Sequence, residues 1–154
     1  MASTLNLYIP FLRVLSASSV MRLDDGNVKL ALVTSGYTFD QMHSTWSQVS
    51  PYEVASGNGY TTGGVALSYS SVGAPNNATQ SLDYANPSWA ALTKTFRFGI
   101  LYWAAATATG SSKIVNPLIG CILFDNTPAD IEVVAQTFDV RISADGLIQQ
   151  AAET

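Results

Sequence analysis

The sequence contains few charged residues. Only 12% of its 154 residues are charged, about half of the ~25% found in a typical soluble domain. The seven basic residues are scattered and the net charge is −4. The chain therefore has no basic patch that could follow a nucleic-acid backbone, and we expect no nucleic-acid partner. Aromatic residues make up 10% of the chain, which excludes a disordered protein. A weakly charged surface of small polar residues suits a subunit inside an assembly, or a secreted domain.

Cysteine and histidine each occur once, as Cys121 and His43. An intrachain disulfide is therefore impossible, and a zinc site built from these residue types would lack ligands. Cys121 lies in an apolar run without a basic neighbour, which indicates a small buried side chain and not a reactive thiol. No Gly-x-Ser-x-Gly motif accompanies His43 to suggest a catalytic triad. We expect no catalytic residue, no metal and no cofactor, and we interpret His43 as a helix-surface or capping residue.

Long apolar runs and leader features are also missing. No apolar stretch reaches the ~20 residues that a transmembrane helix needs, and the opening Met-Ala-Ser-Thr resembles no secretion signal. Internal repeats and heptads are absent as well, which excludes solenoids and coiled coils. We expect no membrane partner, and a chain made of an N-terminal arm (residues 1–20) and a single β domain (residues 21–154).

The sequence does contain a series of short apolar segments. The densest is Trp89–Trp103, which alternates between apolar and polar residues from Leu92 to Phe98 and is apolar throughout from Ile100 to Trp103. The first part predicts a half-buried strand, and the second predicts a strand covered on both faces. Further strands are expected at residues 28–34, 65–69, 118–124 and 131–143, the last with Val134, Gln136 and Phe138 on one face. Asp25-Gly26 and Asp145-Gly146 are hairpin signals; residues 70–87 are expected to form a surface loop with at most a short strand near 81–84, and residues 149–154 a tail.

One short helix is expected, at residues 39–48. Thr38 and Gln41 fit a capping box at its start, and Pro51 would end it. Pro10 argues against a helix in the apolar N-terminal arm, which we expect to be extended and packed on its own domain or on a neighbour. The pattern as a whole predicts an all-β fold: an antiparallel β-sandwich or barrel, jelly-roll-like, with one short helix.

The segment Ser56–Gly64 is rich in glycine, but it lacks the Gly-Lys-Ser/Thr ending and the following helix of a phosphate-binding loop. Its last two residues, Gly63 and Gly64, enter a strand and predict a tight corner in which at least one of them has a positive φ.

The acidic residues stand mostly at turn positions, where aspartate bends the chain. The sequence contains no Ca²⁺-binding loop with alternating aspartates. A pair of catalytic carboxylates of the glycosidase type remains an alternative at the level of the sequence. Arg97 is more specific because it lies inside an apolar strand. We expect it to form a structural ion pair with Glu53, with a ligand-binding arginine as the alternative.

Three segments, in this order, resemble a group of small virion proteins of tailed bacteriophages. The most specific is Tyr52–Leu67, with the pattern Tyr-Glu-Val…Gly-Tyr-x-x-Gly-Gly-x-x-Leu. It follows the strand 28–34 with its Tyr-Thr-Phe-Asp sequence and Trp46, and it precedes Trp89 and the aromatic-Arg strand 96–102. The resemblance covers about residues 28–148, and the N-terminal arm departs from it.

The resemblance implies a non-enzymatic structural protein located in the virion and made in the host cytoplasm. The first expectation is a capsid decoration (cement) protein that docks on the major capsid protein or neighbouring virion subunits and reinforces the head shell, as a homo-oligomer in the particle. A head–tail connector or tail component is the alternative within this class.

A carbohydrate-binding module or glycan-directed enzyme is the alternative from a different class. It is motivated by five aromatic residues, which would have to form a row on an exposed face: Trp46, Tyr60, Tyr84, Trp89 and Trp103. Buried tryptophans would instead favour the virion subunit.

Overall fold

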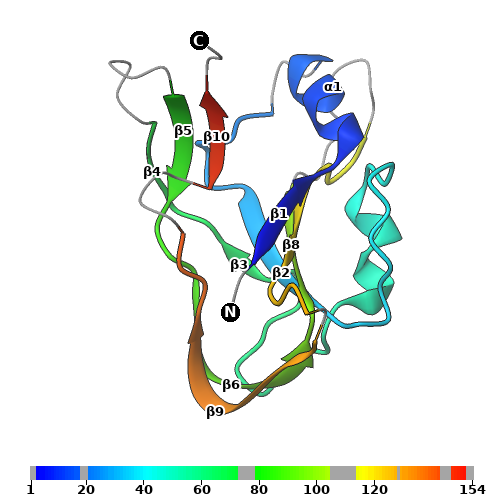
Figure 1. Cartoon of the computed structure of the whole chain (residues 1–154), viewed down its shortest axis with the longest axis vertical. Helices are drawn as coiled ribbons and strands as arrows, with labels where there is room; N and C mark the ends of the chain where they lie inside the picture. The colour runs from blue at the N-terminus through cyan, green and yellow to red at the C-terminus, as the bar shows by residue number, and fades with distance from the viewer. Residues whose placement is uncertain are drawn as a thin grey trace.

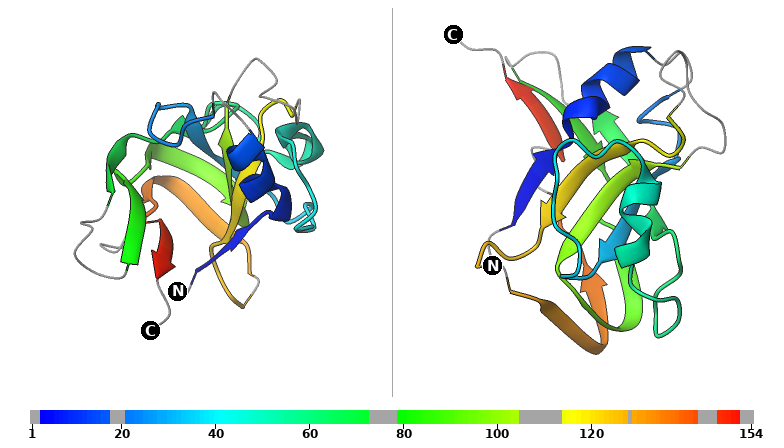
Figure 2. Two further views of the ribbon diagram at one scale, coloured as in Figure 1. Left: turned by 90° about the horizontal axis from the view of Figure 1, so that it is seen from above. Right: turned by 90° about the vertical axis from the view of Figure 1, so that its right-hand side faces the viewer.

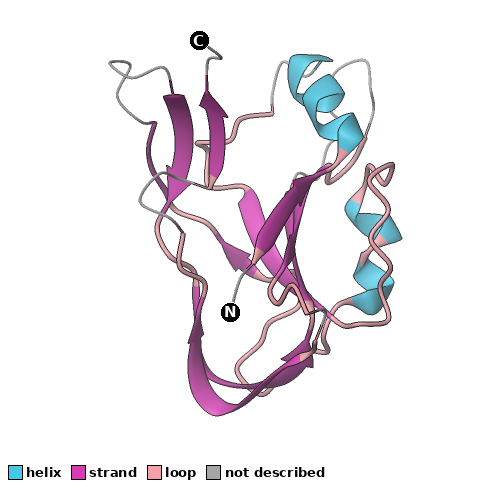
Figure 3. Ribbon diagram, in the orientation of Figure 1, coloured by secondary structure: helices cyan, strands magenta, loops and turns pink. Residues whose placement is uncertain are grey.

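The computed structural model describes residues 3–17, 21–72, 79–104, 114–127, 129–142 and 147–151. It is built from antiparallel strands and one α-helix (Figures 1 and 3), which confirms the all-β fold class. The strands are β1 (Thr4–Leu7), β2 (Val28–Val33), β3 (Val65–Ala66), β4 (Tyr69–Val72), β5 (Thr79–Tyr84), β6 (Ser88–Phe96), β7 (Phe98–Trp103), β8 (Leu118–Leu123), β9 (Ile131–Asp139) and β10 (Ile148–Ala151); the α-helix is α1 (Ile9–Ala17).

The largest sheet has five strands in the order β1-β8-β7-β2-β3. Its inner strands are the most apolar segments of the sequence, and nearly every residue of β2, β7 and β8 is buried. This burial confirms that residues 100–103 are covered on both faces, because alternate residues of a strand point to opposite sides. The register is fixed by apolar pairs such as Leu30 opposite Leu101 and Ile100 opposite Cys121.

The predicted central strand is divided by a bend at Arg97. Its first half, β6, pairs with β9 in a two-stranded ribbon, and its second half, β7, pairs with β8 in the five-stranded sheet. The expected face of β6 is correct, since Leu92 and Phe96 are buried. The expected face of β9 is wrong near its middle: Val133 is buried whereas Val134 is exposed. The register of the ribbon shifts between Leu92 and Lys94, and Ala135 on the opposite strand has a positive φ of 48°, so strict alternation is interrupted there.

The third sheet has the order β10-β5-β4 and lies at one end of the molecule (Figure 1). It corrects two expectations. Residues 70–87, expected as a loop with at most a short strand near 81–84, contain the six-residue strand β5 and most of β4. Residues 149–151, expected as a tail, belong to β10. The expected strand 65–69 is likewise divided between β3 and β4. The hairpin expected at Asp145-Gly146 lies outside the described residues.

The N-terminal segment forms β1 and α1, so the expectation of an extended arm is wrong. Pro10 lies in the first turn of α1, where a helical residue has no intrahelical partner for its N–H, so the missing donor costs nothing there. The strand β1 pairs with β8, and Phe11 and Val14 of the helix are buried in the main core. The segment therefore packs on its own domain.

The helix expected at residues 39–48 is also absent. Asp40 instead forms a turn, in which its Oδ1 accepts from the Met42 N–H at 2.9 Å. Two short 3₁₀ helices follow, Trp46–Gln48 and Ser50–Tyr52. The Gln48 side chain accepts from the Thr45 N–H at 3.1 Å, so the capping interaction lies seven residues after the expected one.

Two apolar cores result, one on each face of the five-stranded sheet. The main core is enclosed by all three sheets and by α1, and the strands curve around it when the molecule is seen from above (Figure 2). The second core lies on the outer face, between the sheet and the segment that carries the two 3₁₀ helices; it contains Tyr8, Ala31, Val33, Tyr37, Val49, Ile100, Tyr102, Leu118 and Cys121.

Candidate functional site

Glu53 ties the glycine-rich segment to the edge of β2. Its Oε1 atom accepts hydrogen bonds from the Tyr60 hydroxyl and from the Gly63 N–H, both at 2.6 Å. The Tyr60 hydroxyl in turn accepts from the Leu32 N–H at 3.2 Å, beyond the point where the two-residue strand β3 stops pairing with β2. The most specific part of the resemblance therefore has a structural role, because Glu53 binds both Tyr60 and Gly63. We refer to these three residues as the lock.

The glycines of this segment allow it to lie directly on the strands. Gly63 and Gly64 have φ values of 90° and 73°, which confirms the predicted corner. A side chain at Gly64 would overlap the Leu30 carbonyl, and a Cβ at Gly59 would lie 2.7 Å from the carbonyl oxygen of Ala90. The N–H groups of Gly57, Tyr60, Gly63 and Gly64 are all bonded within the protein, which argues against an anion-binding loop.

Arg97 pairs with Asp130, so its expected pairing with Glu53 is wrong. The Arg97 Nε lies 2.8 Å from the Asp130 Oδ1, and Ser35 donates to the other carboxylate oxygen at 3.1 Å. Asp130 belongs to the segment between β8 and β9, and this segment lies opposite the bend at Arg97. At the start of the segment, the Phe124 N–H donates to the Arg97 carbonyl. The arginine therefore fixes the bend, and Glu53 is engaged by the lock.

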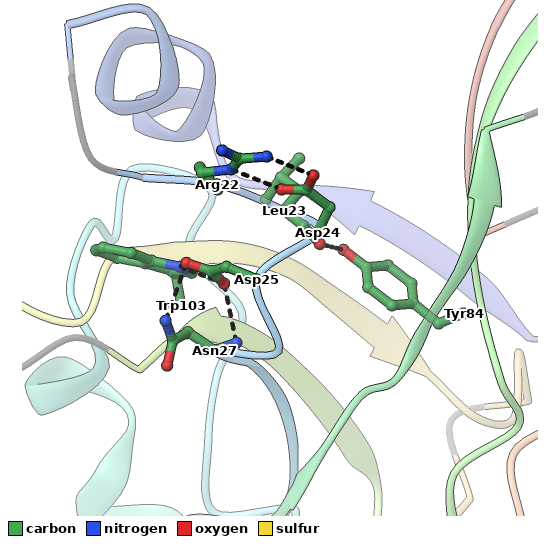
Figure 4. Close-up of polar contacts among 7 residues, drawn as sticks. All are labelled: Arg22, Leu23, Asp24, Asp25, Asn27, Tyr84 and Trp103. Atoms are coloured by element: carbon green, nitrogen blue, oxygen red, sulfur yellow. Dashed lines mark hydrogen bonds and ion pairs between the residues drawn. The ribbon is translucent and has the colours of Figure 1, made fainter.

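A second carboxylate, Asp25, closes the turn before β2 (Figure 4). It accepts from the Asn27 backbone and side chain at 2.9 Å, and the indole Nε1 of Trp103 lies 3.2 Å from both of its oxygens. Close by, the buried Tyr84 hydroxyl donates to the Leu23 carbonyl at 2.7 Å. Burial raises the pKa of Tyr84, and the neighbouring carboxylates raise it further. These contacts hold β5 and β7 to the turn, which is the structural role expected for turn aspartates.

His43 lies at the outer end of a chain of hydroxyl groups. Its Nδ1 is 3.0 Å from the Tyr37 hydroxyl, which is 3.0 Å from the hydroxyl of the buried Tyr8. The Tyr8 hydroxyl interacts with Cys121, whose pKa burial raises to about 12. The 1% exposure of Cys121 confirms the predicted buried side chain, and its raised pKa is the opposite of the lowered pKa that a nucleophilic cysteine needs. His43 is neither on a helix nor capping one; it anchors the segment that covers the second core.

The five aromatic residues that motivated the carbohydrate-binding hypothesis do not form an exposed row. Trp89 and Trp103 are each 5% exposed, and Tyr60 and Tyr84 are 3% exposed. Trp46 is partly buried and stacks on Tyr102, with ring centroids 4.4 Å apart. The arrangement lacks the flat aromatic platform on which a carbohydrate ring would stack.

Two apolar features of the described surface involve the N-terminal segment. Ile9 and Leu12 lie one helical turn apart on α1 and are 55% and 66% exposed, while Met42 is 62% exposed in the loop whose Gln41 carbonyl accepts from the Ile9 N–H. We refer to Ile9, Leu12 and Met42 as the α1 patch. The second feature is a pocket of about 220 Å³ beside β1, lined by Ser3, Leu5, Ile122, Phe124, Val140, Arg141, Ile142 and Leu147.

Sequence reasoning missed both features. The α1 patch depends on a helix that Pro10 seemed to exclude, although the spacing of the inward Phe11 and Val14 against the outward Ile9 and Leu12 is itself helical. The pocket joins residues that are more than 100 positions apart in the sequence, and no local signal could have indicated it.

No family model, characterised protein sequence or solved structure matches this chain. Within the described residues, no three His, Cys, Asp or Glu side chains gather in a way that could hold a metal ion. None of the helices in this part of the chain combines the length and the apolar character needed to cross a membrane. Each polar cluster described above is engaged in holding turns and strands, and the apolar surface around β1 and α1 is the candidate site.

Proposed function

We propose that this protein is a non-enzymatic structural subunit of a tailed-bacteriophage virion, a decoration protein that docks on the head shell as one of several copies. The observation that carries the proposal is the α1 patch. A helix that buries Phe11 and Val14 in its own core presents Ile9 and Leu12 to solvent, and Met42 is exposed in the loop bonded to Ile9. Exposed apolar side chains that lie together, unlike isolated ones, are a feature of interaction sites. The sequence resemblance gives the class of partner.

The arrangement of the polar residues supports the same conclusion. The lone histidine, the lone cysteine and the arginine at the bend each take part in a structural contact. The low charge of the chain, 12% of residues, also suits a surface that is covered by other subunits for most of its life.

The first experiment locates the chain in the particle. Virions of the phage that encodes it should contain the protein after gradient purification, and cryo-electron microscopy should place it at lattice positions on the head. A position at the portal vertex or along the tail would instead favour the connector or tail alternative. Absence of the protein from purified virions would refute the virion role altogether.

The second experiment tests the α1 patch with a matched pair of variants. Leu12→Lys should weaken co-sedimentation of the recombinant protein with particles that lack it by about tenfold or more, because burying a leucine is worth ~1.5–3 kcal/mol. Val134→Lys is the control, since Val134 is 59% exposed on β9, away from α1. Equal binding by the two variants would exclude the α1 patch as the docking surface. Thermal unfolding should confirm that both remain folded, as expected of exposed positions.

A further inference from the structure

We infer that the free edge of β1, together with the pocket beside it, binds an extended segment of another protein chain. The segment would add as a strand to β1, place one large apolar side chain in the pocket and set an acidic residue against Arg141. This site is distinct from the α1 patch, and it does not depend on the virion role.

The edge follows from the register of β1 with β8. Tyr8 donates its N–H to the Ile119 carbonyl at 3.1 Å, so residues 4, 6 and 8 face β8. In an antiparallel pair the intervening residues turn their N–H and C=O groups the other way. Leu5 and Leu7 therefore face outward, and β1 is the last strand of its sheet. No described residue bonds to these outward groups, so they can form main-chain hydrogen bonds with an added strand.

The pocket lies on the side that such a strand would need. Leu5 lines it together with Ile122, the residue opposite Leu5 on β8, and Phe124. The far wall is formed by Val140, Ile142 and Leu147, in the stretch that leads to β10. The side chains of an added strand alternate, so every second one would point to the same face as Leu5. A volume of about 220 Å³ holds one large aliphatic or aromatic side chain. This combination of a free edge and an adjacent side-chain pocket is how strand addition gains both affinity and specificity.

The charge at the pocket determines the class of partner. Arg141 lines the pocket and is exposed, and none of the described residues forms an ion pair with it. All other described lining residues are apolar except Ser3. A guanidinium beside an apolar cavity is complementary to a carboxylate next to an apolar side chain. We therefore assign the site to an extended apolar segment that carries Asp or Glu.

The test uses a random octapeptide display library selected on the full-length protein. Enriched peptides should combine a large apolar residue with an acidic one, and a synthetic copy should bind in solution. Leu7→Pro should weaken this binding about five- to tenfold, because it removes an outward N–H and blocks close approach while leaving the bonds of residues 6 and 8 to β8 intact. The control Leu7→Ala retains the N–H and should bind within about twofold. Arg141→Gln should weaken binding and reduce its salt dependence, whereas Arg13→Gln on α1 should not.

Hydrogen exchange on the wild-type protein gives a readout that does not depend on any variant folding. Peptide binding should slow exchange of the Leu5 and Leu7 amides more than that of Asn6, whose N–H already faces β8. The inference is overturned if no peptide is enriched, if exchange at Leu5 and Leu7 is unchanged by a bound peptide, or if Leu7→Pro and Leu7→Ala bind equally. Dimerisation of the wild type that Leu7→Pro abolishes would mean that a second copy fills the edge, and would overturn the assignment to a different chain. Failure of the virion experiments leaves these outcomes unaffected.

Discussion

Tyr60→Phe should lower the free energy of unfolding by about 2–3 kcal/mol, a large effect for the loss of one oxygen atom. The Tyr60 hydroxyl donates to Glu53 at 2.6 Å, and a hydrogen bond to a charged group is worth ~1.5–3 kcal/mol. The same oxygen accepts from the Leu32 N–H, which is fully buried. The substitution leaves that donor without a partner, at a cost of ~1–3 kcal/mol. The two costs overlap because one hydroxyl makes both hydrogen bonds, and phenylalanine retains the buried ring.

Chemical denaturation monitored by circular dichroism gives the free energy directly, and the melting temperature should fall by roughly 5–10 °C for a domain of this size. Tyr52→Phe is the matched control. The Tyr52 ring is 41% exposed, and its hydroxyl bonds to no other described residue, so its removal should cost less than ~0.5 kcal/mol.

A double-mutant cycle separates the lock from a general effect of removing a tyrosine hydroxyl. Glu53→Gln and Tyr60→Phe together should be less destabilising than the sum of the two single variants, with a coupling of about 1–2 kcal/mol, because both remove the same hydrogen bond. If Tyr60→Phe costs no more than Tyr52→Phe, or if the two substitutions are additive, the Glu53–Tyr60 contact does not stabilise the glycine-rich segment and the description of this segment as a lock is refuted.

Two further predictions concern stability. Gly64→Ala should cost at least ~2 kcal/mol more than Gly26→Ala: both positions have a positive φ, but only at Gly64 would a side chain overlap a carbonyl, that of Leu30. Equal costs for the two variants would show that the overlap is relieved. Stability should also fall as the pH rises above about 10, the pKa of an exposed tyrosine, because burial raises the pKa of Tyr8, Tyr37, Tyr60, Tyr84 and Tyr102, that of Tyr102 to about 12. The raised pKa values mean that these hydroxyls stabilise the fold below pH ~10 and that the stabilisation is lost once the unfolded chain can ionise. Denaturation curves measured across this range should lose stability together with the rise in tyrosinate absorbance, and a flat profile would contradict the burial of these hydroxyls.

Much of the strand framework could be predicted from local pattern, for a physical reason. A strand that is buried on both faces must be apolar throughout, and residues 100–103 and 118–123 meet this condition without ambiguity. The corner at Gly63 and Gly64 was equally local, since two adjacent glycines before a strand indicate a backbone that other residues cannot adopt.

The failures arose where a tertiary contact or a special position overrode a local rule. Pro10 is compatible with a helix only in its first turn, and burial of Phe11 and Val14 stabilises a helix that starts there. The capping sequence at Thr38 and Gln41 did not produce a helix, because Asp40 bonds to the backbone of the following turn.

The partner of Arg97 could not be assigned from the sequence because it depends on the loop before β9. That loop brings Asp130 to the bend, 33 positions away from Arg97 in the sequence. Strand β4 was missed, and β5 was expected only as a short strand near 81–84, for a different reason. The region is dominated by small polar residues, whose weak strand preference is overcome by pairing with each other and with β10.

The placement of the two cores explains why the proposed binding surfaces lie at a sheet edge and on a helix. Each face of the five-stranded sheet is covered, on the inside by the main core and on the outside by Tyr37, Val49 and their neighbours. The faces of this sheet are therefore unavailable to a partner, and a partner that binds the sheet directly would have to use one of its edges. At one edge of this sheet, the glycine-rich segment completes the bonding of β2 beyond the short strand β3 through Tyr60 and Glu53. At the opposite edge, none of the described residues covers β1 in this way, and the helix that follows it turns Ile9 and Leu12 to solvent. The same N-terminal segment thus stabilises the fold through its inward residues and offers its outward edge and helix face to other chains, so substitutions at Phe11 or Val14 should affect folding, whereas those at Leu7 or Leu12 should affect association.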